Sequence, residues 1–226
     1  MLYTEDSVRA NVRNREGKRV FYLGKGDSLT SGARDWLRRE RIEILSAEQA
    51  KPERYRLSNG AYLEEKPEHM THLNAEVLIP KTHPRIGFRG ALDTLEAELI
   101  LAQLAAARSA GKLEEVLSLV RRIIRCDVLE EPLGDVSLCG LSELELRRRS
   151  HFPQEYYGIP HFMPSAADGE AIARLNRARC AAREAEIKAC EAFCDREGSP
   201  TRADILRAMN RVSSMLYLLM LENKAE

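Results

Sequence analysis

The chain has 226 residues, 44% of them hydrophobic and 31% charged, and its 35 basic side chains balance 35 acidic ones to a formal net charge of +0. This neutral total gives no reason to expect a nucleic acid or an acidic membrane as a partner. The five cysteines lack Cys-x-x-Cys spacing, the charged start predicts no secretory leader, and no apolar run reaches the ~18 residues of a membrane span. We therefore expect a cytoplasmic, mainly helical protein.

Residues 1–71 predict a small α/β segment that ends in a flexible linker. A short helix follows Thr4, whose side chain can cap it, and residues 19–23 have the composition of a strand. A glycine-containing loop, a helix that starts at a Ser/Thr cluster and a second strand near residues 42–45 come next. Residues 46–71 are polar, contain proline and show no clear period, which indicates a linker or a flap.

Residues 72–226 predict a helical bundle. Apolar residues recur at helical spacing in four long segments, which cover residues 85–110, 112–131, 169–194 and 201–223. Gly111 stands where the first of these helices is expected to end. Long helices with modest connections are typical of an antiparallel bundle. The predicted fold class is therefore mainly α, a helical bundle with a small N-terminal α/β appendage.

Polar side chains interrupt three of these helices. Arg179, Arg183 and Glu186 fall at positions i, i+4 and i+7 and share one helix face, while Asp93 and Asn210 interrupt the first and the last helix. A charge buried without a partner is costly, so we expect Asp93 to meet Arg179 or Arg183. The set predicts a pocket in which arginine forks bind a polyanion. A solvated charged face or a structural ion pair is the simpler alternative.

The loop of residues 22–30, YLGKGDSLT, offers a second set of groups for a phosphate. Lys25 supplies a cation, Gly26 leaves the backbone open, and Asp27 has a carboxylate suited to Mg²⁺. The loop lacks the Walker A pattern, and a plain surface turn would have the same composition.

An aromatic connection, HFPQEYYGIPHFMP, precedes the helix that carries Arg179. Tyr157, Phe162 and Met163 form an apolar patch there, and core packing is its simplest interpretation. Cys190 and Cys194 stand four residues apart on the following helix, and we expect them to be buried rather than to bind a metal.

Long stretches of the chain match one branch of a known family, and they are LTSGARDWL, THLNAEVLIPKTHPRIGFRGALDTLEAE, RCDVLEEPLG, GLSELELRRRSH and ADILRAMNRVSSMLYLLM. In them the chain resembles the cobalamin adenosyltransferases of ethanolamine utilisation. Shorter motifs are similar to the wider family. YLGKGD is similar to its T-K-x-G-D loop, and RIGFRGALDTL to its R-x-x-A-Y-G-x-x-D-E-L segment. The Arg179, Arg183 and Glu186 helix is similar to its R-x-x-x-R-x-x-E pattern, and NRVSSMLYL to its N-R-L-S-D-Y-L-F segment.

This resemblance implies an adenosyltransferase-like helical bundle and a reaction between ATP, bound with Mg²⁺, and Co(I) cobalamin, giving adenosylcobalamin and triphosphate. It pairs Asp93 with Arg179 of a neighbouring subunit, and these two are the candidate catalytic residues. It implies that Phe162, with Tyr157 and Met163, walls the corrin pocket. The residues implied in ATP binding are Lys25, Gly26, Asp27, Arg179, Arg183, Glu186 and Asn210.

The same resemblance implies partners. The wider family suggests a homotrimer, and this branch leaves a dimer open. A reductase would deliver Co(I), and ethanolamine ammonia-lyase would receive the product. The expected location is the cytoplasm, in association with a bacterial microcompartment.

Two departures from the family patterns bear on these expectations. This branch can carry a histidine and cysteine metal motif, but residues 57–72 contain no cysteine, so we predict no structural zinc or iron. Ser214 stands where the wider family has aspartate, and Glu184 stands at an arginine position. Two alternatives therefore stay open: a non-catalytic sensor of ATP or a corrinoid, and a helical docking protein of a microcompartment.

Overall fold

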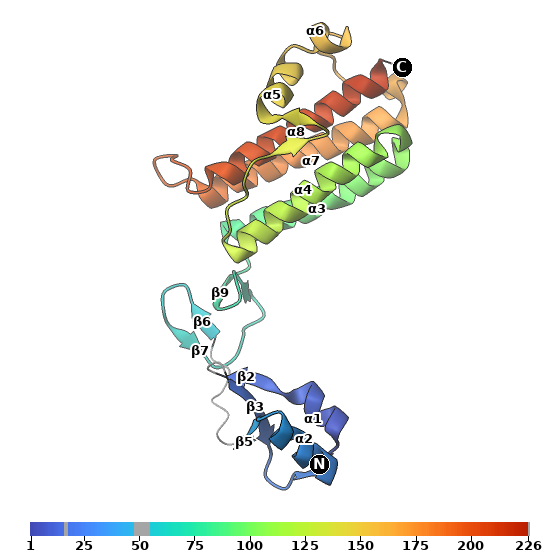
Figure 1. Cartoon of the computed structure of the whole chain (residues 1–226). Helices are drawn as coiled ribbons and strands as arrows, with labels where there is room; N and C mark the ends of the chain where they lie inside the picture. The colour runs from blue at the N-terminus through green and yellow to red at the C-terminus, as the bar shows by residue number, and fades with distance from the viewer. Residues whose placement is uncertain (16–17, 48–54, 226) are drawn as a thin grey trace. The chain divides into compact units, whose positions relative to one another are not determined.

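The computed structural model describes residues 1–15, 18–47 and 55–225, so residues 48–54 of the expected linker lie outside the described residues. The chain divides into two compact units, Met1–Lys66 and Pro67–Glu226 (Figure 1). The boundary expected after residue 71 falls inside a strand of the second unit. None of the helices in the described ranges is long and apolar enough to span a membrane.

The first unit is a small α/β structure with its own core around Phe21 and Leu37. Its strand β3 (Lys18–Leu23) pairs antiparallel with β2 (Arg13–Arg15) and parallel with β5 (Glu43–Ser46), which confirms the two expected strands. Strands β6 and β7 form an antiparallel hairpin in the stretch where the sequence predicted no regular element. The other elements are β1 (Leu2–Tyr3), α1 (Glu5–Asn11), β4 (Ser28–Leu29), α2 (Ser31–Arg39), β6 (Tyr55–Leu57) and β7 (Tyr62–Leu63).

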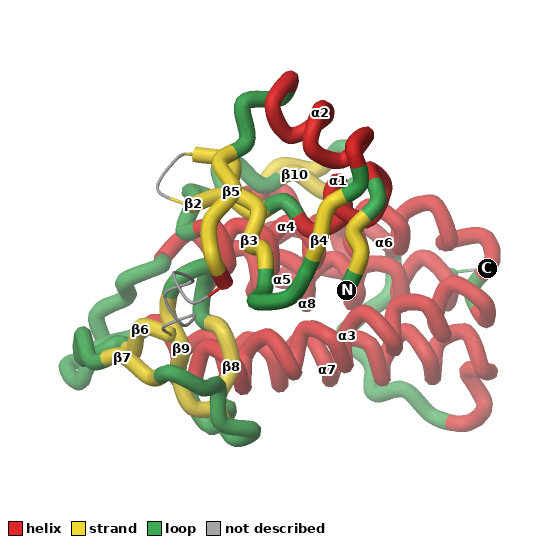
Figure 2. Tube along the Cα trace, turned by 90° about the horizontal axis from the view of Figure 1, so that it is seen from below, coloured by secondary structure: helices red, strands yellow, loops and turns green. Residues whose placement is uncertain are grey.

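The second unit contains the helical bundle. Four long helices lie side by side, α3 (Pro84–Ala105), α4 (Ala110–Leu129), α7 (Gly169–Phe193) and α8 (Ala203–Lys224) (Figures 1 and 2). The shorter elements are β8 (Met70–His72), β9 (Val77–Pro80), β10 (Ser137–Leu138), β11 (Leu141–Ser142), α5 (Glu143–His151) and α6 (Pro153–Tyr157). The mainly α fold class with a small N-terminal α/β part is confirmed.

Helices α3 and α7 run antiparallel. The rings of Phe88 and Phe193 meet edge to face, with centroids 5.4 Å apart, while Glu98 pairs with Arg177 further along both helices. The face that α7 buries is rich in alanine, and small side chains let neighbouring helices approach closely. The helical spacing of apolar residues predicts a buried stripe of Ile172, Leu175, Ala182, Ala185, Ala189 and Phe193, and all six are buried. Ala178 and Ala181 are buried beside them.

The turn between α3 and α4 differs from the expectation. Helix α3 ends at Ala105, a single 3₁₀ turn covers Ala107–Ser109, and α4 begins at Ala110, so Gly111 lies inside α4 rather than behind α3. Ala106 leaves the helical region at φ −110° and ψ 62°, and its side chain is buried. The reversal therefore occurs at buried alanine, because packing of the helix ends outweighs the preference of glycine for a C-terminal cap.

A buried ion cluster joins the start of α3 to the end of α4. Asp127 is fully buried, and its carboxylate accepts from Nε of Arg85 at 2.8 Å and from Nε of Arg89 at 2.6 Å. Arg89 also donates to the carbonyl of Leu73 at 2.7 Å, which ties the β8–β9 turn to the bundle. A buried carboxylate held by two arginines satisfies the charges of all three groups.

Asp127→Asn should therefore lower the free energy of unfolding by about 3–5 kcal/mol, because it leaves two largely buried guanidinium groups without their carboxylate. Urea denaturation of the full chain measures this change. Glu130→Gln is the matched control, since Glu130 also pairs with Arg85, at 3.4 Å, but is exposed. We expect the control to change the free energy by less than about 1 kcal/mol. Equal effects of the two substitutions would contradict the role given to Asp127.

Candidate functional site

A polar network connects α7 and α8. The amide nitrogen of Asn210 donates to Oε1 of Glu186 at 2.8 Å, and the amide oxygen of Asn210 accepts from Arg211. Arg211 also donates to the main-chain carbonyl of Glu143 at 3.3 Å, at the start of α5. Two of the residues singled out in the sequence, Glu186 and Asn210, are thus in direct contact.

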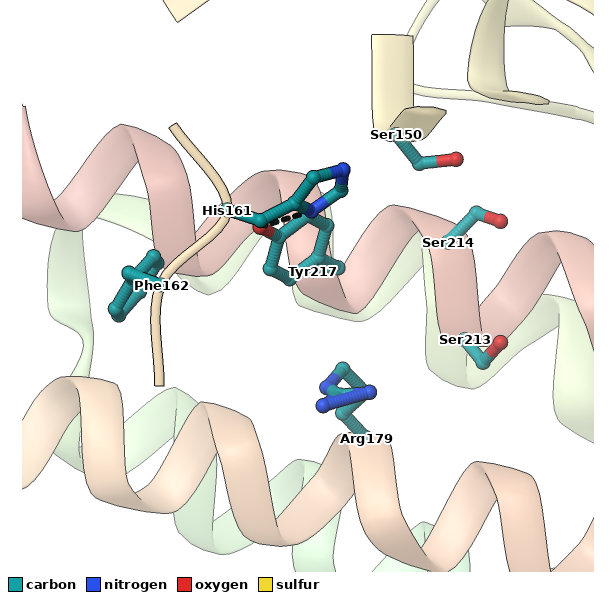
Figure 3. A pocket seen from close by; sticks show the side chains of 7 residues that line it. All are labelled: Ser150, His161, Phe162, Arg179, Ser213, Ser214 and Tyr217. Atoms are coloured by element: carbon teal, nitrogen blue, oxygen red, sulfur yellow. Dashed lines mark hydrogen bonds between the residues drawn. The ribbon is translucent and has the colours of Figure 1, made fainter. Parts of the chain in front are cut away.

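Arg179 forms the floor of a cavity of about 270 Å³ between α5, α7 and α8 (Figure 3). Its guanidinium carbon lies 5.8 Å from the centroid of the Tyr217 ring, at cation–π distance. Its Nε is buried and has no hydrogen-bond partner among the described residues. The cavity is lined by Ser150, His161, Phe162, Arg179, Ser213, Ser214 and Tyr217.

One wall of this cavity is aromatic. Nδ1 of His161 lies 3.0 Å from the hydroxyl of Tyr217, and the other ring nitrogen lies 3.3 Å from the carbonyl of His151. Phe162 stacks on Tyr217 with centroids 6.3 Å apart, and Nζ of Lys224 lies 4.8 Å from the centroid of Phe162. Burial raises the pKa of Tyr217 above its usual value, so the hydroxyl keeps its proton.

The three aromatic-connection residues that the sequence grouped together separate in the structure. Phe162 lines the cavity, and Tyr157 packs partly buried against the bundle core, where burial raises its pKa. Met163 is 91% exposed and contributes nothing to a wall in this chain.

Two charged residues lie outside this network. Arg183 is exposed, and its guanidinium has no ion pair among the described residues. Asp93 is also exposed and likewise unpaired within the described chain, so the expected burial of Asp93 beside Arg179 or Arg183 is not seen. The rotation of α3 about its own axis explains this difference. Asp93 lies on the same exposed helix face as Gly87 and Gly90, and not on the face that packs into the core.

The departures at Glu184 and Ser214 have local explanations. Glu184 is exposed and accepts from Arg177 at 3.4 Å, an ion pair on the surface of α7. The hydroxyl of Ser214 lines the cavity and donates to the carbonyl of Asn210 at 3.1 Å. The cavity therefore has a neutral hydroxyl where a carboxylate was expected from the wider family pattern.

The loop of residues 22–30, which was expected to contact phosphate, lies in the first unit. Lys25 is exposed, and Gly26 adopts a positive φ of 88°, a conformation that favours glycine. Asp27 accepts from the Met1 ammonium at 2.6 Å and from the Gly24 N–H at 3.2 Å. The first of these bonds is the main cause that lowers the pKa of Asp27, so its carboxylate is ionised and closes the loop.

The described residues were compared with the groupings that hold a resident metal. No set of three or more His, Cys, Asp or Glu side chains is placed to hold an ion within residues 1–15, 18–47 and 55–225. Cys190 is exposed and Cys194 partly buried, which corrects the expectation that both are buried. Partial desolvation raises the pKa of the Cys190 thiol although the residue is exposed, and Cys194 and Glu186 add to the effect.

Sequence reasoning missed several residues of the cavity. Tyr217 lies seven positions after Asn210 and therefore on the same face of α8, a spacing that could have identified it. Ser150 and His161 come from α5 and an irregular connection, for which no periodicity signals convergence on α7 and α8.

Comparison with known proteins gives consistent results. The sequence model of the family described as cobalamin adenosyltransferase matches residues 61–222. The chain is 34% identical to the corrinoid adenosyltransferase EutT of Salmonella typhimurium over an alignment of 247 positions, which covers 99% of this chain and 92% of that protein. It is 33% identical to the corrinoid adenosyltransferase EutT of Escherichia coli K12 over an alignment of 242 positions, which covers 96% of this chain and 90% of that protein. No solved structure matches the chain.

The contact between Glu186 and Asn210 can be measured by a double-mutant cycle on the free energy of unfolding. We expect Glu186→Ala and Asn210→Ala to couple by about 1 kcal/mol, because each removes the same hydrogen bond to a charged group. Arg183→Ala, on the same helix but without a partner, should change stability by less than about 0.5 kcal/mol. Additive effects of the first two substitutions would show that their side chains do not interact in solution.

Proposed function

The chain belongs to the cobalamin adenosyltransferase family, and from this premise we propose that it transfers the 5′-deoxyadenosyl group of ATP to the Co(I) ion of cobalamin. The lone pair of Co(I) attacks C5′, the Co–C bond forms, and the C5′–O bond breaks to release triphosphate. The structural observation that carries the proposal is the contact of Glu186 with Asn210, next to a cavity whose floor is Arg179.

In this reaction the protein positions the substrates and stabilises charge, and it does not supply a nucleophile. The substrate supplies the attacking electron pair, so side chains act by orienting ATP and by stabilising charge on the leaving triphosphate. Arg179, Arg183 and Lys25 carry the positive charge in this proposal. The exposure of Arg183 and Lys25, with no ion pair in the described chain, supports a role toward a ligand.

Mg²⁺ fits this arrangement through Glu186. One carboxylate oxygen of Glu186 accepts from Asn210, and the other has no hydrogen bond in the described part of the chain. Mg²⁺ commonly binds one or two carboxylates together with substrate phosphates. When bound, it would neutralise phosphate charge. Asn210 would then orient the carboxylate of Glu186. Asp27, in the loop of the first unit, is proposed separately as a candidate Mg²⁺ ligand.

The corrin contact is proposed at the aromatic wall. Phe162 and Tyr217 present stacked rings to the cavity, and rings of this kind exclude water from an apolar ligand. Met163 is exposed enough to contact a large ligand that extends beyond the cavity, while Tyr157 packs partly buried against the bundle core.

A second copy of the chain is proposed to cover the exposed face of α3. This face runs through Gly87, Gly90, Asp93, Ala97, Ile100, Leu101 and Leu104, all of them exposed. Leu104 is 78% exposed, and contiguous exposed apolar side chains of this kind mark interaction sites. The charge of Asp93 and those of Arg179 and Arg183 on α7, which have no ion pair among the described residues, would meet across such an interface. The result is a homo-oligomer, as a trimer or a dimer, in which Asp93 pairs with an arginine of the neighbouring copy.

The likeness to the ethanolamine-utilisation branch supports the biological setting. We propose that the enzyme works in the cytoplasm, in association with a bacterial microcompartment. A reductase would supply the Co(I) state, and ethanolamine ammonia-lyase would take up the adenosylcobalamin. These partners follow from the resemblance and from the reaction chemistry.

The deciding experiment is an anaerobic assay of cob(I)alamin with MgATP on protein freed of transition metals, followed by visible spectroscopy. Formation of adenosylcobalamin establishes the transferase. ATP that raises the melting temperature without product would favour the non-catalytic sensor. If neither ATP nor cobalamin changes the protein, the docking protein becomes the better interpretation.

In the same assay, Arg183→Ala should lower kcat/KM for ATP by about 100-fold, or roughly 2.7 kcal/mol of transition-state stabilisation. The substitution removes a cation that the fold does not use. Arg177→Ala is the matched control on α7, because Arg177 is occupied by Glu98 and Glu184. We expect the control to stay within about threefold of the unchanged chain. Similar losses in both variants would remove Arg183 from the site.

Leu104→Glu should shift the chain to a smaller species in sedimentation velocity, because a charge placed within an apolar contact opposes association. Leu144→Glu is the matched control, since Leu144 is 80% exposed but lies on α5. The proposal for the α3 face is abandoned if the unchanged chain already sediments as a monomer, or if the two variants behave alike.

A further inference from the structure

Helix α5 carries an arginine, Arg147, that forms no ion pair with the described residues and is not among the proposed ATP-binding residues. The guanidinium of Arg147 is exposed and makes no hydrogen bond or ion pair with any described residue. It nevertheless lies close to Arg211. Burial, the larger cause, and the charge of Arg147 both lower the pKa of Arg211. Glu143 and Glu186 act in the opposite direction and offset part of the repulsion between the two guanidinium groups, and an anion between these groups would relieve the rest.

Arg147 is also one helical turn from the cavity. Ser150 follows it by three residues on α5, its hydroxyl bonds the carbonyl of Arg147 at 3.0 Å, and Ser150 lines the cavity. On α8, Arg211 precedes Ser213 and Ser214, which line the same cavity. Neither arginine is part of the cavity lining, but each stands one helical turn before a serine at the end where the serines gather.

That end of the cavity is rich in donors. Figure 3 shows the hydroxyls of Ser150, Ser213 and Ser214 at one end and the rings of His161, Phe162 and Tyr217 at the other. No carboxylate lines the cavity within the described chain. The two acids that act on Arg211 lie outside this lining: Glu143, which has the larger effect, is the first residue of α5, and Glu186 is bonded to Asn210. A donor-lined space with no acid in its lining is suited to an anion.

The serine hydroxyls and Nε of Arg179 can donate hydrogen bonds to a ligand. The hydroxyls of Ser213 and Ser214 both donate to the carbonyl of Asn210, at 3.2 and 3.1 Å. That carbonyl has two lone pairs and also serves the helix, so one hydroxyl can rotate to a ligand at little cost. Nε of Arg179 is buried without a partner, and a ligand oxygen would satisfy it.

We propose that this cavity binds a phosphate group, with Arg147 and Arg211 at its entrance, Arg179 at its floor, and the hydroxyls of Ser150, Ser213 and Ser214 as donors. Its volume of about 270 Å³ lies just below the ~300–1,000 Å³ of typical ligand pockets, which suits a phosphate and its immediate neighbours. The inference rests on the proposed function for its ligands, which are the triphosphate of ATP and the phosphodiester of the corrinoid nucleotide tail. It gives α5 a binding role beside α7 and α8.

The first test is calorimetric titration of the full chain with inorganic triphosphate at low salt. We expect binding by the unchanged chain, a loss of at least tenfold in affinity for Arg147→Ala, and partial recovery for Arg147→Lys. Arg148→Ala is the matched control, because Arg148 packs on the ring of Tyr156 at 5.8 Å rather than toward Arg211. It should stay within twofold. No binding by the unchanged chain, or equal losses in the two alanine variants, overturns the inference.

The second test identifies the source of the phosphate. If Arg147→Ala raises KM for ATP alone, the cavity holds the triphosphate of ATP. If it raises KM for cobalamin but not for cobinamide, which lacks the phosphodiester, the cavity holds the nucleotide tail. Unchanged KM values for all three substrates overturn the inference even if triphosphate binds. Adenosylcobalamin formed by a chain that does not bind triphosphate would refute the inference alone, whereas triphosphate binding without product would refute the proposed function alone.

Discussion

The alanine-rich face of α7 is the constraint on which the site depends. Ala178, Ala181, Ala182 and Ala185 are fully buried, so α7 lies close to both α3 and α8 along its length. Close approach brings the opposite edge of the same helix turns near α8, where Glu186 reaches Asn210 and Arg179 reaches Tyr217. Larger side chains on this face would separate the helices by more than a hydrogen bond can tolerate. Packing and binding geometry are therefore set by the same residues.

Charge is distributed differently in the interior and at the surface of the bundle. The buried carboxylate of Asp127 is held by two arginines and ties the β8–β9 turn to α3 and α4. Arg147, Arg183 and Asp93, in contrast, are exposed and make no ion pair in the described chain. A fold that holds its buried carboxylate with two arginines leaves these exposed charges for ligands or for other copies of the chain. This contrast underlies both the proposed ATP contacts and the phosphate cavity.

The first unit raises a separate question, because its loop is closed by its own contacts. Asp27 is held by the Met1 ammonium and the Gly24 N–H, while Lys25 and Gly26 are exposed beside it. This ordered loop presents a cation and an open backbone, in keeping with the expected phosphate contact. Binding of Mg²⁺ by Asp27 would require exchange of the ammonium for the ion. Comparing the kinetics of Lys25 and Asp27 variants would distinguish phosphate binding by Lys25 from Mg²⁺ binding by Asp27.

The sequence by itself determined the fold class, the family, the buried stripe of α7 and the shared face of Arg179 and Glu186. Each of these depends on local periodicity or on long matching stretches, which the sequence contains in full. Only the tertiary structure decided that Asp93 is exposed, that the α3–α4 reversal occurs at Ala106, and that Ser150, His161 and Tyr217 meet Arg179. These outcomes depend on the rotation of each helix about its axis and on the path of an irregular connection. Both are set by contacts between residues far apart in the sequence, for which local spacing carries no signal.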